Sequence, residues 1–181
     1  MIQYIVSTNT SVPYILVHME SGSTIKQLKN TIQHLIETVN SDDIVLCAWA
    51  MPYDDCINSM FEVLASHCFV VVAAGNTNEP IEKYTPTCAK NVIVVGALNK
   101  SGKKASLSGY SDTRPIEWVI GTNYNVNGKL ESGTSISAAL YASFLAEAVR
   151  ERDYGRVQDQ ITCYHSRVMA EYEIIMKHKV D

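Results

Sequence analysis

The sequence predicts an α/β fold in which helices flank a mostly parallel β-sheet. Short apolar runs alternate along the chain with longer amphipathic stretches, which is the pattern of strands and crossover helices. The run Phe69–Ala74 is apolar at every position, as expected of a strand that is buried on both faces of a parallel sheet. With 181 residues and 46% hydrophobic content, the chain is long enough to bury one sizeable core.

The same length and composition indicate one domain over residues 1–181. No repeat, low-complexity tract or linker divides the chain. We expect a core at 1–155 and a C-terminal helix at 156–181 that packs on it.

Several segments have the short apolar composition of strands and should form a sheet of about six strands. They are Ile2–Val6, Tyr14–His18, Ile44–Trp49, Phe69–Ala74, Val92–Gly96 and Ile116–Ile120.

The intervening stretches predict helices with recognisable starts. The expected helices begin after a cap at Ser23 or Thr24, after Asp54 or Asp55, at the segment Gly133-Thr134-Ser135, and near Asp159. The third should run to about Arg152 and the last to Lys177. Because Val168, Tyr172 and Ile175 share one side of the last helix, we expect it to pack on the sheet.

A hydroxyl residue directly follows Gly-Thr where the third helix begins. The segment Glu131–Leu140 contains Gly133-Thr134-Ser135 and continues into an alanine-rich stretch. It resembles the nucleophile motif of the subtilases, the subtilisin-like serine peptidases, whose pattern is Gly-Thr-Ser-x-Ala-x-Pro. Phe69–Asn76 resembles the family's strand that ends in the oxyanion-hole asparagine, and Asn91–Ser111 resembles its Val-Gly-Ala to Ala-Ser-x-Ser segment.

The resemblance implies a three-layer subtilisin-like fold with Ser135 at the nucleophile position and Asn76 at the oxyanion position. A serine hydroxyl needs a neighbouring base, usually a histidine that a carboxylate orients. Family members place the aspartate at the end of the first strand, but here Val6 or Ser7 holds that position and no carboxylate precedes Glu20. The family's His-Gly-Thr-His segment has no counterpart between Ser7 and Tyr14.

Another histidine could replace the missing base. His18 is the best candidate, because it ends an expected strand near the cleft, although a packed or exposed histidine is the commoner condition. No spacing marks a base at the remaining histidines, His34, His67, His165 and His178.

Asn76 has two readings that the sequence leaves open. As an oxyanion donor it would stabilise negative charge beside Ser135. Alternatively, Gly75-Asn76 turns the chain after a buried strand, because both residue types tolerate left-handed backbone angles.

The substrate cleft also departs from the family pattern. Subtilases have Ser-Leu-Gly-Gly where this chain has Ala48, Trp49, Ala50 and Met51. We assign Ala48, Trp49, Ala50 and Gly75 to substrate binding, and we expect bulky side chains where a peptide would lie. Trp49 is either an anchor for a partner or a core residue.

Charge and composition exclude several functions. A net charge of −4 without a basic cluster argues against nucleic acid. No apolar run approaches the ~20 residues of a membrane span, and the N-terminus lacks the pattern of a signal peptide, so we expect a cytoplasmic protein. Five cysteines without a Cys-x-x-Cys pair fit a reducing compartment. We expect no metal and no cofactor, because the paired aspartates lack the spacing of a calcium loop.

Three functions therefore remain. The favoured one is a pseudopeptidase that binds a peptide or protein partner. The alternative is an active serine hydrolase whose base is His18 or comes from a partner chain. A structural subunit of a larger particle is the third, and the sequence leaves an oligomer open.

Overall fold

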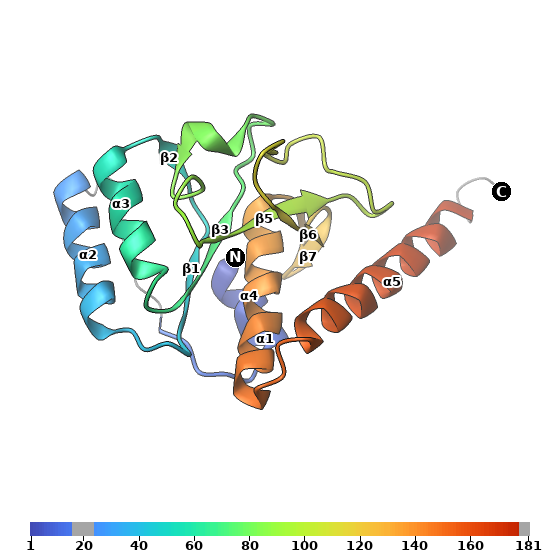
Figure 1. Ribbon diagram of the computed structural model, residues 1–181. Helices are drawn as coiled ribbons and strands as arrows, with labels where there is room; N and C mark the ends of the chain where they lie inside the picture. The colour runs from blue at the N-terminus through green and yellow to red at the C-terminus, as the bar shows by residue number, and fades with distance from the viewer. Residues whose placement is uncertain (16–23, 178–181) are drawn as a thin grey trace.

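The computed structural model describes residues 1–15 and 24–177, and it has three layers (Figure 1). The middle layer is a parallel sheet in the order β1-β3-β5-β6. Its strands are β1 (Ile44–Cys47), β3 (Phe69–Ala73), β5 (Ile93–Leu98) and β6 (Glu117–Ile120). The predicted α/β fold is confirmed, but the main sheet has four strands where about six were expected.

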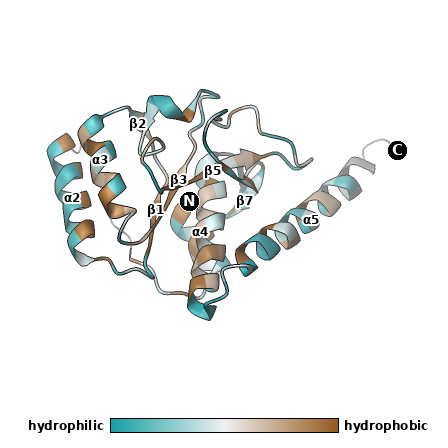
Figure 2. Cartoon of the chain, in the orientation of Figure 1, coloured by the Kyte–Doolittle hydropathy of each residue, from teal (hydrophilic) through white to brown (hydrophobic). Residues whose placement is uncertain are grey.

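The two faces of β3 bury separate cores. Val71 and Ala73 contact the core that includes α4 (Thr134–Glu151), whereas Val70 and Val72 belong to the core beneath the opposite helices. All four side chains are buried, as the uninterrupted apolar run predicts for a strand inside a parallel sheet. Figure 2 shows the hydrophobic colours gathered in this sheet and hydrophilic colours on the outer faces of the helices.

The layer on one face consists of α2 (Ile25–Thr38) and α3 (Asp55–Leu64). Thr24 caps α2 in a reciprocal capping box with Gln27, and the Asp54 carboxylate accepts a hydrogen bond from the backbone of Ile57 at 2.9 Å. Both helices start at caps that the sequence predicts, because a cap is a local interaction.

The opposite layer contains α1 (Ile2–Asn9), α4 and α5 (Arg156–Lys177), with α1 packed against α4. Ser137 of α4 donates to the carbonyl of Val119 at 2.9 Å, and a Cβ added to Gly121 would lie 2.1 Å from Ser137 Oγ. Only glycine allows the start of α4 to approach the end of β6 this closely.

The expectation of a strand at Ile2–Val6 is wrong, because this segment is part of α1. A five-residue segment with four apolar residues does not distinguish a strand from a short buried helix. Ile5 is fully buried against α4, and the side chains of Thr8 and Asn9 hydrogen-bond carbonyls one turn back, as they can only in a helix. The alignment of Val6 or Ser7 with an aspartate at a strand end therefore loses its structural basis.

The second expected strand, Tyr14–His18, falls mostly outside the described residues. Tyr14 and Ile15 are described, and neither belongs to a strand.

Helix α5 begins at Arg156, three residues before the expected start, and its first half lies against β6. The Tyr164 hydroxyl donates to the carbonyl of Ile120 at 2.9 Å, and Nε2 of His165 accepts from the Ile120 N–H at 3.1 Å. Its second half extends away from the body of the protein (Figure 1).

Two small antiparallel pairs complete the fold. β2 (Met51–Pro52) pairs with β4 (Tyr84–Thr85), just after the 3₁₀ helix η1 (Ile81–Lys83). β7 (Tyr124–Val126) pairs with β8 (Lys129–Glu131). Within the described ranges, no helix has the length and apolar character needed to cross a membrane.

Candidate functional site

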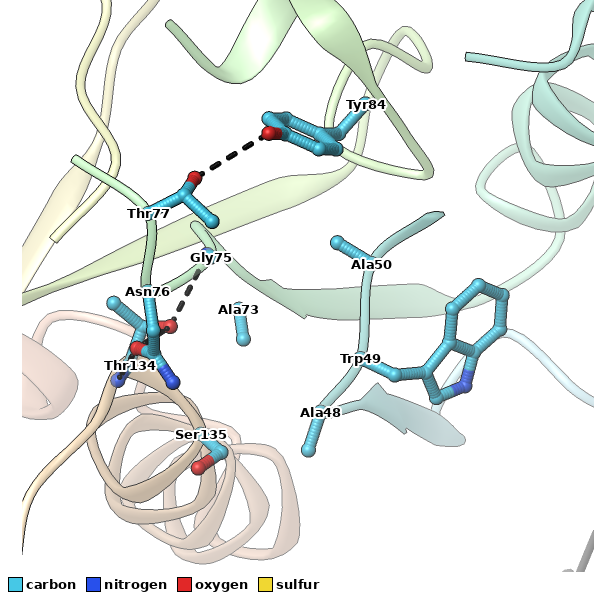
Figure 3. Close-up of a pocket in the computed structure, with 10 residues that line it drawn as sticks. All are labelled: Ala48, Trp49, Ala50, Ala73, Gly75, Asn76, Thr77, Tyr84, Thr134 and Ser135. Atoms are coloured by element: carbon cyan, nitrogen blue, oxygen red, sulfur yellow. Dashed lines mark hydrogen bonds between the residues drawn. The ribbon is translucent and has the colours of Figure 1, made fainter. Parts of the chain in front are cut away.

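A cavity of about 190 Å³ lies where β1 and β3 end and α4 begins (Figure 3). Ligand sites of parallel sheets commonly occupy this end. The lining comes from four segments and carries no charged side chain: Ala48, Trp49, Ala50, Ala73, Gly75, Asn76, Thr77, Tyr84, Thr134 and Ser135. The structure therefore brings together Ser135, Asn76 and all the residues that we assigned to substrate binding.

The amide of Asn76 is held in one orientation by Thr134. Asn76 Oδ1 accepts hydrogen bonds from the Thr134 N–H at 2.9 Å and from its hydroxyl at 3.0 Å. Thr134 Oγ1 in turn accepts from the Gly75 N–H at 3.1 Å. Because the oxygen of the amide takes both Thr134 donors, the Nδ2 donor is left for another group.

Asn76 Nδ2 and the Ser135 hydroxyl lie on the same side of Gly133. A Cβ added to Gly133 would be 3.2 Å from Asn76 Nδ2 and 3.4 Å from Ser135 Oγ. A side chain at this position would crowd both groups, so glycine keeps the space between them open. Among the hydrogen bonds of the described residues, neither the Ser135 N–H nor its hydroxyl has a partner.

None of the described histidines forms a hydrogen bond with Ser135. His34 is exposed on α2, His67 contacts the carbonyl of Val63 through Nδ1 at 2.8 Å, and His165 accepts from Ile120. Burial lowers the pKa of His165, which favours the neutral form that this bond requires. His18, the suggested substitute base, and His178 lie outside the described residues.

Trp49 lines the cavity, but its indole points away from Asn76 and Ser135. Its ring packs edge-on against Phe61 with the ring centroids 5.9 Å apart. Figure 3 shows the methyl groups of Ala48 and Ala50 on the side of Asn76 and Ser135, with the indole pointing the opposite way. On the side that faces Asn76 and Ser135, this wall therefore presents the small side chains of Ala48 and Ala50.

Tyr84 and Thr77 form a rim that the sequence did not reveal. The Tyr84 hydroxyl donates to the Glu79 carboxylate and accepts from Thr77 at 3.4 Å, while Lys83 pairs with Glu79 at 3.0 Å. The hydrogen bonds from Tyr84 and then Lys83 lower the pKa of Glu79. No sequence signal marks Tyr84, because its place depends on the pairing of β2 with β4.

The described residues contain no group of three or more histidine, cysteine, aspartate or glutamate side chains that could hold a metal ion. The described lining of the cavity offers hydroxyl and amide groups beside alanine side chains.

Comparison with known proteins gives a consistent result. The model of the subtilase family matches residues 6–172. Subtilisin-like protease 1 of Pseudogymnoascus destructans is 33% identical over 102 residues, which cover 52% of this chain and 25% of that protein. A cuticle-degrading serine protease of Orbilia oligospora is 31% identical over 106 residues, or 51% of this chain and 24% of that protein. The chain spans about a quarter of the length of these relatives.

Solved structures agree on the fold. A cold-adapted subtilisin-like serine proteinase superposes with a TM-score of 0.66 at 19% identity, covering 81% of this chain and 56% of that one. The self-cleaved protease domain of PatA superposes with a TM-score of 0.57 at 19% identity, covering 75% and 57%.

Proposed function

This chain belongs to the subtilase family, and from that membership we propose that it binds peptides or protein segments without hydrolysing them on its own. Its nucleophile and oxyanion positions, Ser135 and Asn76, share one cavity. The sequence offers no counterpart of the family's aspartate or histidine motifs.

One observation carries the proposal. Within residues 1–15 and 24–177, no hydrogen bond joins the Ser135 hydroxyl to a histidine or a carboxylate. An unassisted serine hydroxyl is a weak nucleophile at neutral pH. In a serine peptidase, loss of the base lowers turnover by on the order of 10⁶-fold, whereas binding groups are unaffected.

The wall of the cavity supports binding of an extended chain. Ala48, Trp49 and Ala50 connect β1 to β2 and make no backbone hydrogen bonds outside those strands among the described contacts. Their peptide groups are free to pair with an added strand, a common mode of peptide recognition.

The test separates binding from turnover. Purified protein is treated with a fluorophosphonate probe and with fluorescent peptides, and both affinity and cleavage are measured. We expect peptide binding with neither stoichiometric labelling of Ser135 nor turnover. Ser135→Ala should behave like wild type in the cleavage assay, as should Ser166→Ala, a matched change at an exposed serine of α5. Labelling together with cleavage that Ser135→Ala abolishes would overturn the proposal.

A serine hydrolase with an external base is the second candidate. The shared position of Asn76 Nδ2 and Ser135 Oγ beside Gly133 favours it, because acyl transfer needs a nucleophile and an oxyanion donor around one point. The base would be His18 or a residue of a partner chain. This candidate requires an activity that Ser135→Ala removes and that appears in the correct assembly, or that is lost in His18→Ala.

A further inference from the structure

We propose that the tip of the β7–β8 hairpin is a site of spontaneous deamidation at Asn127, and that the side chain of Asn125 controls its rate. Deamidation converts an asparagine to aspartate or isoaspartate and consumes only water. Neither residue lines the cavity at Ser135, so the inference does not depend on peptide binding there.

Asn127 is the only asparagine of the chain that precedes a glycine. In deamidation, the backbone nitrogen of the following residue attacks the side-chain amide carbon, and a side chain on that residue obstructs the attack. Gly128 has no side chain, and a Cβ added to it would meet no atom within 4 Å. Both residues are exposed, so solvent water has access to the reacting groups.

Asn127 and Gly128 form the turn between β7 and β8. Their φ angles are 50° and 85°, and Val126 pairs with Lys129 across them. Two-residue hairpin turns with left-handed angles at both central positions strongly favour the dipeptide Asn-Gly. The dipeptide that suits the geometry of this turn is therefore also the one most open to deamidation.

A hydrogen bond holds the nitrogen that would attack. Asn125 Oδ1 accepts from the Gly128 N–H at 2.7 Å. This bond must break before the Gly128 nitrogen loses its proton and turns toward the side chain of Asn127. Because a single hydrogen bond contributes about 0.5–1.5 kcal/mol net, the Asn125 side chain should slow the reaction by about 2- to 10-fold.

The reaction needs no oxidant or cofactor. The deprotonated Gly128 nitrogen forms a bond to Cγ of Asn127, and the bond from Cγ to the side-chain nitrogen breaks, so that ammonia leaves with the proton. The product is a cyclic succinimide. Water then adds to one of the two ring carbonyls and opens the ring to aspartate or isoaspartate. In sum, one water is consumed and one ammonia is released.

The products alter the tip of the hairpin. Isoaspartate adds a carbon to the main chain, so the turn between Val126 and Lys129 becomes too long for its two-residue geometry. Either product also adds a negative charge next to Lys129, which already pairs with Glu131 at 2.6 Å. The base of the hairpin is held by the bond from the Asn123 N–H to Ser132 Oγ at 2.9 Å, so we expect the change to remain at the tip.

The experiment measures the rate of deamidation at each asparagine. The full chain is incubated at mildly alkaline pH, and samples are digested and analysed by tandem mass spectrometry that resolves Asn127 from Asn123 and Asn125. We expect Asn127 to be the principal site, with both aspartate and isoaspartate as products. Because the attacking nitrogen must be deprotonated, the rate should rise with pH.

Three variants test the role of Asn125. Asn125→Ala removes the acceptor, and the reaction at Asn127 should become about 2- to 10-fold faster. Asn125→Asp keeps an acceptor oxygen for the Gly128 N–H and should react no faster than wild type. Leu130→Ala is the matched control, because Leu130 is exposed and lies opposite Asn125 in the hairpin, and its rate should be that of wild type. In urea, unfolded wild type and unfolded Asn125→Ala should react at the same rate.

The outcomes separate the site from its control. Deamidation that spares Asn127 in the folded wild type would overturn the site. Equal rates in folded wild type and Asn125→Ala, or the same acceleration in Leu130→Ala, would overturn control by the Asn125 side chain. Different rates in the two unfolded chains would also overturn this control, because the effect would then come from the local sequence and not from the bond in the folded hairpin.

Discussion

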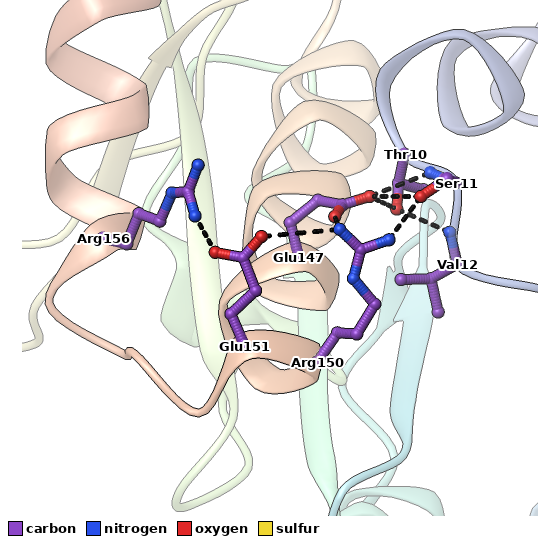
Figure 4. Close-up of polar contacts among 7 residues, drawn as sticks. All are labelled: Thr10, Ser11, Val12, Glu147, Arg150, Glu151 and Arg156. Carbon is purple, nitrogen blue, oxygen red and sulfur yellow. Dashed lines mark hydrogen bonds and ion pairs between the residues drawn. The ribbon is translucent and has the colours of Figure 1, made fainter.

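The two ends of α4 differ in how many of the polar groups beside them are hydrogen-bonded or ion-paired. At the N-terminal end, the Ser135 hydroxyl and Asn76 Nδ2 face a cavity, and the described contacts give them no partner. At the C-terminal end, charged side chains are joined to one another and to neighbouring segments (Figure 4). The start of α4 thus has donors without a described partner beside a cavity, whereas the side chains at its end are bonded to neighbouring segments.

Glu147 is the centre of the C-terminal network. Its carboxylate accepts from the Thr10 hydroxyl at 2.6 Å and from the Ser11 N–H at 2.8 Å, and it pairs with Arg150. The side chain is only 15% exposed. These bonds fix the segment that leaves α1 against α4.

The largest effect is expected when the N-terminal end of α4 is displaced. Gly121→Ala places a Cβ 2.1 Å from Ser137 Oγ and 2.9 Å from the Gly133 carbonyl, so the helix start must shift. We expect a loss of about 3 kcal/mol in the free energy of unfolding, measured by urea denaturation, together with weaker peptide binding. Gly155→Ala, where the nearest atom is 3.6 Å away, is the control. An unchanged stability in Gly121→Ala would contradict the close approach.

The second substitution removes Glu147, the central carboxylate at the C-terminal end of α4. Glu147→Ala leaves the Ser11 N–H and the Thr10 hydroxyl without their acceptor, and we expect a loss of about 2 kcal/mol. Hydrogen exchange should become faster in α1, while peptide affinity remains that of the wild type. Loss of affinity at unchanged stability would show that the two ends are not independent.

The third expectation concerns pH and the attachment of α5. Burial lowers the pKa of His165 from its ordinary value of 6.5, so the folded state binds protons less readily than the unfolded state. Its contribution to stability is therefore complete above about pH 6.5 and is lost as pH falls toward the lower folded value. Urea denaturation between pH 5 and 8 should show a steeper acid decline in wild type than in His165→Gln. Parallel profiles would contradict this linkage.

The smallest effect is expected at the surface. Arg156 pairs with Glu151, but the side chains are 47% and 34% exposed. Arg156→Ala should lower the free energy of unfolding by less than about 0.5 kcal/mol, and added salt should shrink the difference further. A loss as large as that of Glu147→Ala would mean that the whole network, and not the Glu147 carboxylate, holds this end.

Local signals explain which parts of the fold were predictable. The caps at Thr24 and Asp54 were visible because they act within three residues. The buried strand at Phe69–Ala73 was visible from its length and composition. The sequence does not reveal the helix at Ile2–Val6, because its burial against α4 involves residues more than a hundred positions away, which a short apolar run does not encode.

Some residues of the candidate site are likewise predictable from the sequence, and others depend on the tertiary structure. Ser135 and Asn76 were found through motifs, and their common cavity follows from the ends of parallel strands. Two features were not predictable. The direction of Trp49 depends on how the chain turns after β1, and the position of Tyr84 depends on the pairing of β2 with β4.

The contacts of α5 with Ile120 have a consequence for self-association. Tyr164 and His165 occupy both backbone hydrogen-bonding groups with which Ile120 could recruit a foreign strand. Exposed strand borders are templates for aggregation, and covering them with a helix is one way in which proteins prevent it. The long terminal helix thus covers the end of β6 at Ile120 against the addition of a strand.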